Sequence, residues 1–358
     1  MFYKPQKKLA VLISALAATC LLIVPGCGSD SSSDTTEALS TTTVAPTTTT
    51  VAPEPVEKPL IVVTTNILGD VVSKAVGELF DVETIMPPGA DPHVFQASAK
   101  QVDRMMKADL LVVNGANFEE GLLDVIKGAE SDGVKVFEAM NSVDPLEDHD
   151  EEGHDDHEGH DDHDEEGHDG HDDHHGHDHG GVDPHFFTDP GRMAQVVNQL
   201  SDFLVLNFPE IDGEDLVSHM ADYSKKLTDL DSEVMQTLSS IPESSRVLVT
   251  NHEVFAYFAE SYDFKILGTI IPSASTLSNA SAKDLVDLAE EMKTEGVLAV
   301  FVDSSSSDAL ADALAGELDG VAVVTLFSES LGPEDSAGST YLDMVRTNSE
   351  LIASALTG

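Results

Sequence analysis

Short apolar runs rich in β-branched residues recur along most of this 358-residue chain, and stretches with helical spacing separate them. Because parallel strands need a crossover between them, usually a helix, this alternation predicts α/β units with parallel sheets. Apolar residues fill the runs almost continuously, which is typical of strands covered on both faces. The runs form two groups, so we expect two α/β lobes: 60–64, 110–113 and 134–137 in the first, and 246–250, 265–270, 297–303 and 321–326 in the second.

One long amphipathic helix is predicted between the two groups, over 213–241. Its apolar residues recur every three or four positions, it has no internal proline, and a proline lies beyond each end. Such a helix would be a stiff strut between two lobes; the alternative is that it packs on one lobe alone. A second helix is expected over 281–295, where Ser281 and Asp284 resemble a capping box.

The first 26 residues have the pattern of an export signal. Three lysines precede an apolar run over 9–24, which is short for a membrane span and ends just before Cys27. The end of the run resembles a bacterial lipobox, in which cleavage leaves Cys27 as a lipidated N-terminus; the alternative is an uncleaved anchor with an incidental cysteine. In both cases we expect an exported protein that is held to the outer face of the cytoplasmic membrane.

Composition sets the domain boundaries and excludes some partners. The formal net charge of −48 makes nucleic acid and anionic lipid poor partners. No Walker A sequence and no Gly-x-Gly-x-x-Gly motif supports nucleotide binding. We predict a signal peptide over 1–26, a Ser/Thr/Pro-rich linker over 27–59, an N-terminal lobe over 60–212 that contains a loop over 147–181, a connecting helix over 213–241 and a C-terminal lobe over 242–358.

The loop is built from a tract of imidazoles and carboxylates. Residues 147–179 comprise eleven His, seventeen Asp or Glu and five Gly. Such a segment has nothing to bury in a core, but imidazole and carboxylate groups bind divalent cations. Glycines and like charges oppose one rigid site, so many weak metal sites are expected; the alternative is a solvated, low-complexity segment. The auxiliary ligands would be His154, His157, His160, His163, His168, His171, His174, His175, His177 and His179.

Four histidines lie outside the tract, and three of them are in settings that look arranged. His93 and His185 each end an Asp-Pro-His sequence, the first after the strand-like run 81–86 and the second directly after the tract, and His252 follows the predicted strand 246–250. His219 lies within the long helix, where we expect an ordinary surface residue. Taken singly, a histidine at a strand end is more often a hydrogen-bonded structural residue than a ligand, but the repeated Asp-Pro-His favours a shared site.

A carboxylate is expected to complete the site. Ligands of open α/β sheets bind beyond the carboxyl ends of the strands. Glu329 follows the predicted strand 321–326 of the second lobe by three residues. Together with His93, His185 and His252 it forms a set of three imidazoles and one carboxylate, with two ligands from each lobe.

Four segments resemble the motifs of the solute-binding lipoproteins of zinc and manganese ABC transporters, and the match covers 60–358. They are the Gly-Ala-Asp-Pro-His loop at 89–93, Val-Asp-Pro-His-Phe-Phe-Thr-Asp-Pro at 182–190, an expected helical run over 252–262, and 341–348. In that family the first two motifs each supply a His, the third supplies His or Glu, and the fourth ligand is usually Asp; here Glu329 takes its place. The resemblance implies two Rossmann-like lobes joined by a rigid helix, with the metal in the interlobe cleft.

The expected function is to capture Zn²⁺ and deliver it to an ABC permease, as a monomer and without enzymatic activity. Three imidazoles and one carboxylate suit tetrahedral Zn²⁺, whereas Mn²⁺, the alternative in the same family, prefers more oxygen ligands. A surface metal buffer or adhesin and a zinc hydrolase are the rival classes. For a hydrolase, His252-Glu253 begins a His-Glu-x-x-His motif, but residue 256 is Ala. Because ligation needs neutral imidazole, affinity should fall as pH drops through about 6.5.

Overall fold

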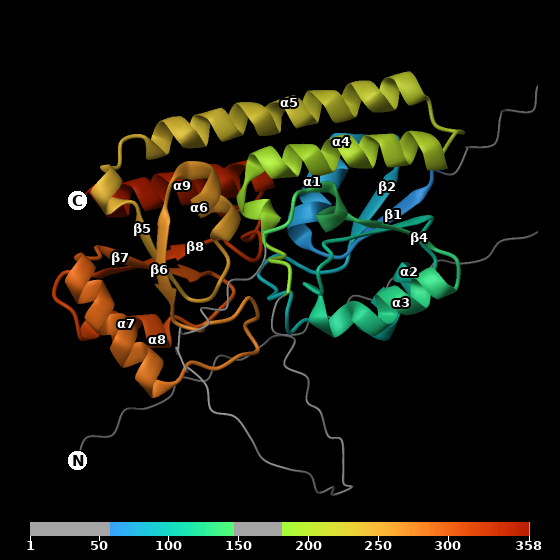
Figure 1. Ribbon diagram of the computed structural model, residues 1–358. Helices are drawn as coiled ribbons and strands as arrows, with labels where there is room; N and C mark the ends of the chain where they lie inside the picture. The colour runs from blue at the N-terminus through green and yellow to red at the C-terminus, as the bar shows by residue number, and fades with distance from the viewer. Residues whose placement is uncertain (1–57, 147–180, 358) are drawn as a thin grey trace, which may run out of the picture. The chain divides into compact units, whose positions relative to one another are not determined.

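The computed structural model describes residues 58–146 and 181–357, which contain two four-stranded parallel sheets (Figure 1). The strands run in the order β2-β1-β3-β4 in the first sheet and β6-β5-β7-β8 in the second. All pairs are parallel, which confirms the predicted α/β class. The bounds are β1 (Leu60–Val63), β2 (Asp81–Thr84), β3 (Leu110–Val113), β4 (Lys135–Glu138), β5 (Val247–Thr250), β6 (Lys265–Thr269), β7 (Ala299–Asp303) and β8 (Ala322–Leu326).

Helices cover both faces of each sheet. In β1, Val62 packs with residues of α2 and α3, whereas Ile61 and Val63 pack with residues of α1, α4 and α5. The second sheet repeats this division, with α7 and α8 on one face. The helices are α1 (Asn66–Val76), α2 (Ala99–Met105), α3 (Leu123–Ser131), α4 (Pro190–Asn207), α5 (Gly213–Leu238), α6 (Ala256–Tyr262), α7 (Ala282–Glu295), α8 (Ala309–Gly316) and α9 (Tyr341–Thr357).

The long helix α5 touches both lobes. It packs against α1 and α4 beside the first sheet and against α9, which packs on β8 of the second. Its buried side chains are the apolar residues that recur every three or four positions, together with Ser224. The helix ends at Leu238, earlier than predicted, because the backbone tightens to bonds such as Ile241 N to the Leu238 carbonyl (3.0 Å) ahead of Pro242. The domain boundaries drawn from the sequence stay a prediction.

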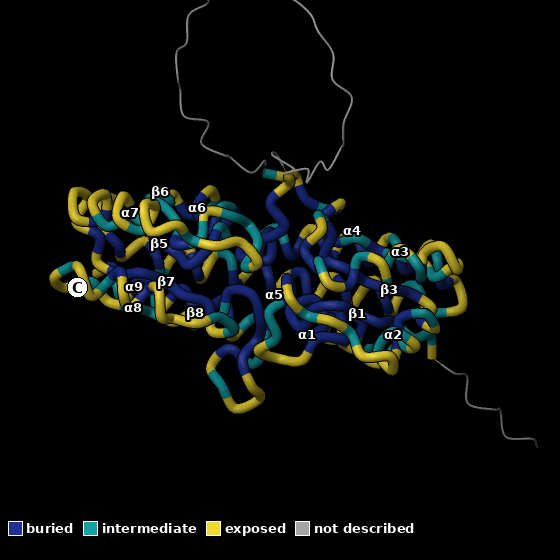
Figure 2. The backbone as a smooth tube through the Cα atoms, turned by 90° about the horizontal axis from the view of Figure 1, so that it is seen from below, coloured by how far each residue is buried: buried dark blue, intermediate teal, exposed yellow. Residues whose placement is uncertain are grey.

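The main apolar core is continuous between the sheets. One cluster contains Ile61 and Val112 of the first sheet, Leu227 of α5, and Leu248 and Phe301 of the second sheet. The central strands β1, β3, β5 and β7 are mostly buried, whereas many residues of the surrounding helices, such as α7, are exposed (Figure 2). In α7, Ser281 and Asp284 form the predicted capping box. Because the core is continuous, it holds the loops at the carboxyl ends of the strands on a rigid base.

No helix in the described ranges is both long enough and apolar enough to cross a bilayer. The predicted export signal, Cys27, nearly all of the linker 27–59, and the tract 147–179 with its ten expected auxiliary histidines lie outside the described residues. These predictions are therefore not tested by the structure.

Candidate metal centre

The structure brings together the four residues singled out in the sequence. One potential ligand atom from each of His93, His185, His252 and Glu329 lies within 4.8 Å of the other three. All four residues are buried, with at most 3% of their surface exposed. Within residues 58–146 and 181–357 this is the one group of three or more His, Cys, Asp or Glu side chains so arranged.

Glu329 lies at the centre of the group. Its Oε1 is 3.0 Å from Nε2 of His252 and 3.2 Å from Nε2 of His185, and its Oε2 is 3.3 Å from Nε2 of His93. The Nε2 atoms of His93 and His185 and Oε2 of Glu329 are buried without a hydrogen-bond partner. Buried polar atoms seldom lack a hydrogen-bond partner, and three such atoms close together fit a site that binds a cation.

Three of the four residues lie in loops that leave the carboxyl end of a strand. His93 comes from the loop after β2, His252 follows β5 by two residues, and Glu329 follows β8, whereas His185 directly precedes the short helical turn Phe186–Thr188. The expected helical run over 252–262 is only partly correct, because α6 begins at Ala256. Two hydrogen bonds engage the backbone before α6: the Thr250 hydroxyl donates to the carbonyl of His252 (2.7 Å), and Glu253 N donates to the carbonyl of Ser273 (3.1 Å).

The two Asp-Pro-His sequences form the same local turn. In each, the Asp carboxylate accepts the backbone N–H of the His two residues later, at 2.9 Å in both Asp91–His93 and Asp183–His185. Asp183 also lies 2.7 Å from Nδ1 of His185, whereas Nδ1 of His93 contacts Glu120 at 3.2 Å. A carboxylate on Nδ1 holds the ring so that Nε2 is presented to the metal.

A different device holds the Glu329 loop. Oδ2 of Asp303, the last residue of β7, accepts three hydrogen bonds of 2.8 Å, from the backbone N–H and the hydroxyl of Ser328 and from the backbone N–H of Glu329. Asn66 binds the next two residues, donating to the Ser330 hydroxyl and accepting from the backbone N–H of Leu331, both at 2.7 Å. The loop that carries Glu329 is thus hydrogen-bonded to both lobes.

Aromatic rings form an apolar wall beside the site. The Phe118 ring lies edge-on to His93 at 5.0 Å and to His185 at 5.5 Å between ring centroids. Phe187 packs on Phe118 and on His185. These contacts exclude water from one side and lower the local dielectric constant, which strengthens interactions between the charges that remain.

The burial and the carboxylates shift the pKa values in opposite directions. Burial by itself would lower the pKa of His93, but the nearby carboxylates of Glu120 and Glu329 raise the pKa to about 9. Burial likewise opposes protonation of His185, yet Glu329 and Asp183 raise its pKa to about 10. Burial would raise the pKa of Glu329, but His185 and His252 hold it well below its usual range. Without a cation, Glu329 is thus an ionised carboxylate next to the protonated imidazoles of His93 and His185.

Comparison with known proteins decides the family. The family described as "Zinc-uptake complex component A periplasmic" matches residues 61–355. The chain belongs to this family. The match confirms the resemblance to metal-binding components of ABC transporters that the four sequence motifs indicated.

Two curated relatives and one solved structure are similar to this chain over most of its length. The zinc-binding protein TroA of Treponema pallidum is 28% identical over 304 residues, 84% of this chain and 89% of that protein. The manganese-binding lipoprotein MntA of Bacillus subtilis is 26% identical over 356 residues, 97% of each chain. The structure of the periplasmic zinc-binding protein TroA from Treponema pallidum matches with a TM-score of 0.67 at 26% identity, covering 84% of this chain and 99% of that chain.

The sequence indicated the four central residues of the site but not the carboxylates that hold them. The sequence did contain an indication of Asp91 and Asp183, because two Asp-Pro-His sequences predict two loops with the same geometry. Glu120 and Asp303 also follow or end a strand, but nothing in their spacing pairs them with a ligand. His219 lies on α5 with 45% of its side chain exposed, in contact with Asp215, as expected of a surface residue.

Proposed function

We propose that this protein captures Zn²⁺ in the site formed by His93, His185, His252 and Glu329 and delivers it to the permease of an ABC transporter. The observation that carries the proposal is a buried set of four donors within 4.8 Å, drawn from loops of both sheets. Zn–N and Zn–O bonds of roughly 2.0–2.1 Å in a tetrahedron separate neighbouring ligand atoms by about 3.3–3.4 Å. The distances of 3.0–3.3 Å between Glu329 and the imidazoles are close to this spacing.

Zinc is the favoured cargo because the donor set is rich in nitrogen. Imidazole suits Zn²⁺, whereas Mn²⁺ prefers more oxygen ligands and a higher coordination number. The family description and the name of TroA support zinc. Manganese is the second candidate, favoured by the similarity to a manganese-binding lipoprotein over nearly the full length of both chains.

Capture and delivery fit the site better than catalysis. A catalytic zinc site keeps one position open for water. Glu329 takes that position here, so the protein acts as a binding component and not as a hydrolase. We further propose that it is a monomer, exported and anchored through a lipid on Cys27 to the outer face of the cytoplasmic membrane. The relatives named as lipoproteins support the anchor.

Calorimetric titration of the full chain and of a chain lacking 147–181 tests the site and the metal together. Zn²⁺ should bind to one tight site in both chains and outcompete Mn²⁺ for it. His93→Ala and His252→Ala should each abolish tight binding, because each leaves a buried gap in the donor set. His219→Ala is the matched control and should bind as the wild type does. Tight binding retained in both site variants would contradict the assignment.

Two further measurements separate the rival functions. Deleting the gene should prevent growth when zinc is scarce if the protein delivers zinc; a metal buffer or adhesin would leave that growth intact. A zinc-dependent hydrolase activity that survives Glu329→Ala would favour an enzyme over a transport component.

A further inference from the structure

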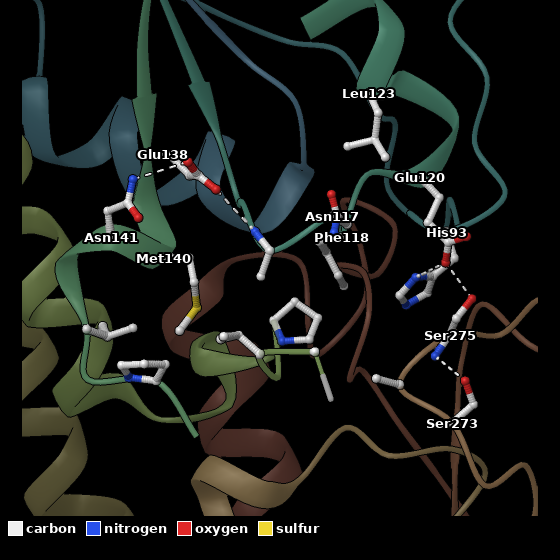
Figure 3. A pocket seen from close by; sticks show the side chains of 17 residues that line it. His93, Asn117, Phe118, Glu120, Leu123, Glu138, Met140, Asn141, Ser273 and Ser275 are labelled. Atoms are coloured by element: carbon white, nitrogen blue, oxygen red, sulfur yellow. Dashed lines mark hydrogen bonds and ion pairs between the residues drawn. The ribbon is translucent and has the colours of Figure 1, made fainter. Parts of the chain in front are cut away.

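His93 is the point at which the buried site meets a solvent pocket. A pocket of about 850 Å³ is lined by His93, Glu120, Ser273 and Ser275, among others (Figure 3). Of the four proposed ligands, His93 alone contributes to this lining. An ion that moves between the pocket and the site therefore passes the His93 side.

Glu120 lies at this boundary and touches both lobes. Its Oε1 contacts Nδ1 of His93 at 3.2 Å and accepts the hydroxyl hydrogen of Ser275, which lies in the loop after β6 (Figure 3). The side chain of Glu120 is 32% exposed, whereas that of Glu329 is fully buried. A parallel contact joins Thr276 to Asp91, the residue that holds the backbone N–H of His93 (2.8 Å and 2.9 Å).

The other two imidazoles lack such a contact. Nδ1 of His185 is held by Asp183, a buried residue of its own loop, and Nδ1 of His252 has no hydrogen-bond partner. The ring of His93 is thus the one whose Nδ1 partner is itself hydrogen-bonded to the other lobe.

The backbone just before Glu120 has an uncommon conformation. Gly115, Ala116 and Asn117 have φ values of 94°, 49° and 58° in succession, and two of them are not glycine. Left-handed backbone at such residues costs free energy and is concentrated at functional sites. A Cβ on Gly121 would lie 2.1 Å from the carbonyl oxygen of Phe95, so this segment presses closely on the loop that carries His93.

We propose that Glu120 is a positioning residue for His93, which sets how fast the ion passes between the pocket and the site. The inference rests on the metal-binding function proposed above. With Ser275 attached, Glu120 holds the His93 ring with Nε2 towards Glu329. When the contact with Ser275 opens, the ring is free to turn, and the ion gains its route out past His93.

The test is the rate at which one equivalent of bound Co²⁺ leaves the full chain for an excess of chelator. Absorption by tetrahedral Co²⁺ reports the buried site. Loss of a carboxylate behind a ligating His typically weakens a site by roughly 10–100-fold. Glu120→Ala should therefore raise the dissociation rate by roughly 10-fold or more, and Ser275→Ala should raise it in the same direction.

Glu120→Gln separates positioning from charge. Both contacts of Glu120 use the one oxygen Oε1, so a Gln carbonyl oxygen can accept both hydrogen bonds after the negative charge is lost. We expect its dissociation rate to stay close to the wild-type rate. The matched control is Glu138→Gln, which removes the same charge from the same pocket, where Glu138 contacts Ala116 and Asn141 but not His93.

Two results would overturn the proposal: a rate for Glu120→Ala equal to that of Glu138→Gln, or a rate for Glu120→Gln equal to that of Glu120→Ala. The second would mean that charge and not positioning matters. Failure of the wild-type chain to bind Co²⁺ or Zn²⁺ tightly would instead contradict the proposed function itself.

Discussion

The two lobes share a strand order but support their ligands differently. Each sheet has its first strand beside its second and third. In the first lobe, carboxylates hold both His rings at Nδ1, Glu120 on His93 and Asp183 on His185. In the second lobe, His252 has no partner on Nδ1, and hydrogen bonds to the backbone of its loop hold Glu329.

The two lobes therefore contribute to the site in different ways. The first lobe supplies imidazoles whose orientation depends on side-chain contacts at Nδ1. The second lobe supplies the negative charge and places its ligands through the backbone at strand ends, so they are fixed with the sheet. We therefore expect substitutions in the second lobe to affect charge and stability, and substitutions in the first to affect orientation and exchange.

Glu329→Gln should produce the largest loss of affinity. The substitution removes the one anionic ligand while keeping its volume, and breaking a buried charged pair typically costs about 3–5 kcal/mol. That is roughly two to three and a half orders of magnitude in Kd for Zn²⁺, measured by chelator competition. Glu233→Gln, which removes an exposed carboxylate paired with Arg346, should leave the Kd unchanged. A near-wild-type Kd for Glu329→Gln would contradict the expectation that the second lobe contributes through its negative charge.

The pH dependence should extend higher than the ordinary histidine pKa implies. Because the pKa values of His93 and His185 are raised to about 9 and about 10, both rings are protonated at pH 7 and must lose these protons on binding zinc. Affinity should then rise by up to about a hundredfold per pH unit above pH 7, and titrations in buffers of different ionisation enthalpy should detect the protons released. An affinity that levels off above pH 6.5 would contradict the raised values.

The stability of the ion-free protein should instead fall as the pH rises. The two raised pKa values contribute stability that is fully present below about pH 6.5. This contribution is lost as the pH rises through 9 and 10, so the ion-free melting temperature should fall over that range.

Asp183→Ala tests the orientation of a first-lobe imidazole. The Asp183 carboxylate accepts from both the backbone and the ring of His185, and Ala removes both contacts, so we expect affinity to fall by roughly 10–100-fold. Asp91→Ala is the comparison, because Asp91 holds the backbone of His93 but not its ring, and it should lose less. Equal losses would mean that the turn and not the ring contact matters.

Asp303→Asn should mainly lower the stability of the second lobe. One carboxylate oxygen accepts three hydrogen bonds in a buried position, and an amide leaves at least one donor without its acceptor. We expect a loss of about 1–3 kcal/mol in the free energy of unfolding, measured with urea. Asp308→Asn is the control, because Asp308 makes no capping bond to α8.

Deleting 147–181 should have the smallest effect on the tight site. Asp183 N donates to the carbonyl of Leu146 at 3.0 Å, so a short Gly-Ser linker can join the ends. We expect the number of weak Zn²⁺ sites to fall while the tight Kd stays the same. A weaker tight site after deletion would mean that the tract takes part in it.

The local pattern of residues made much of the fold and site predictable. Apolar runs marked the strands because covered strands need apolar side chains on both faces, and the repeated Asp-Pro-His marked two loops with one geometry. The approach of His93, His185, His252 and Glu329 followed from a general rule about strand ends, without any measured contact.

The arrangement around these ligands needed the tertiary structure. Glu120 meets His93 from 27 residues away and Ser275 from 155 residues away. Such pairs depend on how loops from separate strands pack, which no local spacing encodes. The chain's own sequence therefore determined which four side chains would come together and that three of them follow strands. Only the packed structure decided which carboxylates hold them, because that depends on distances between segments far apart in the chain.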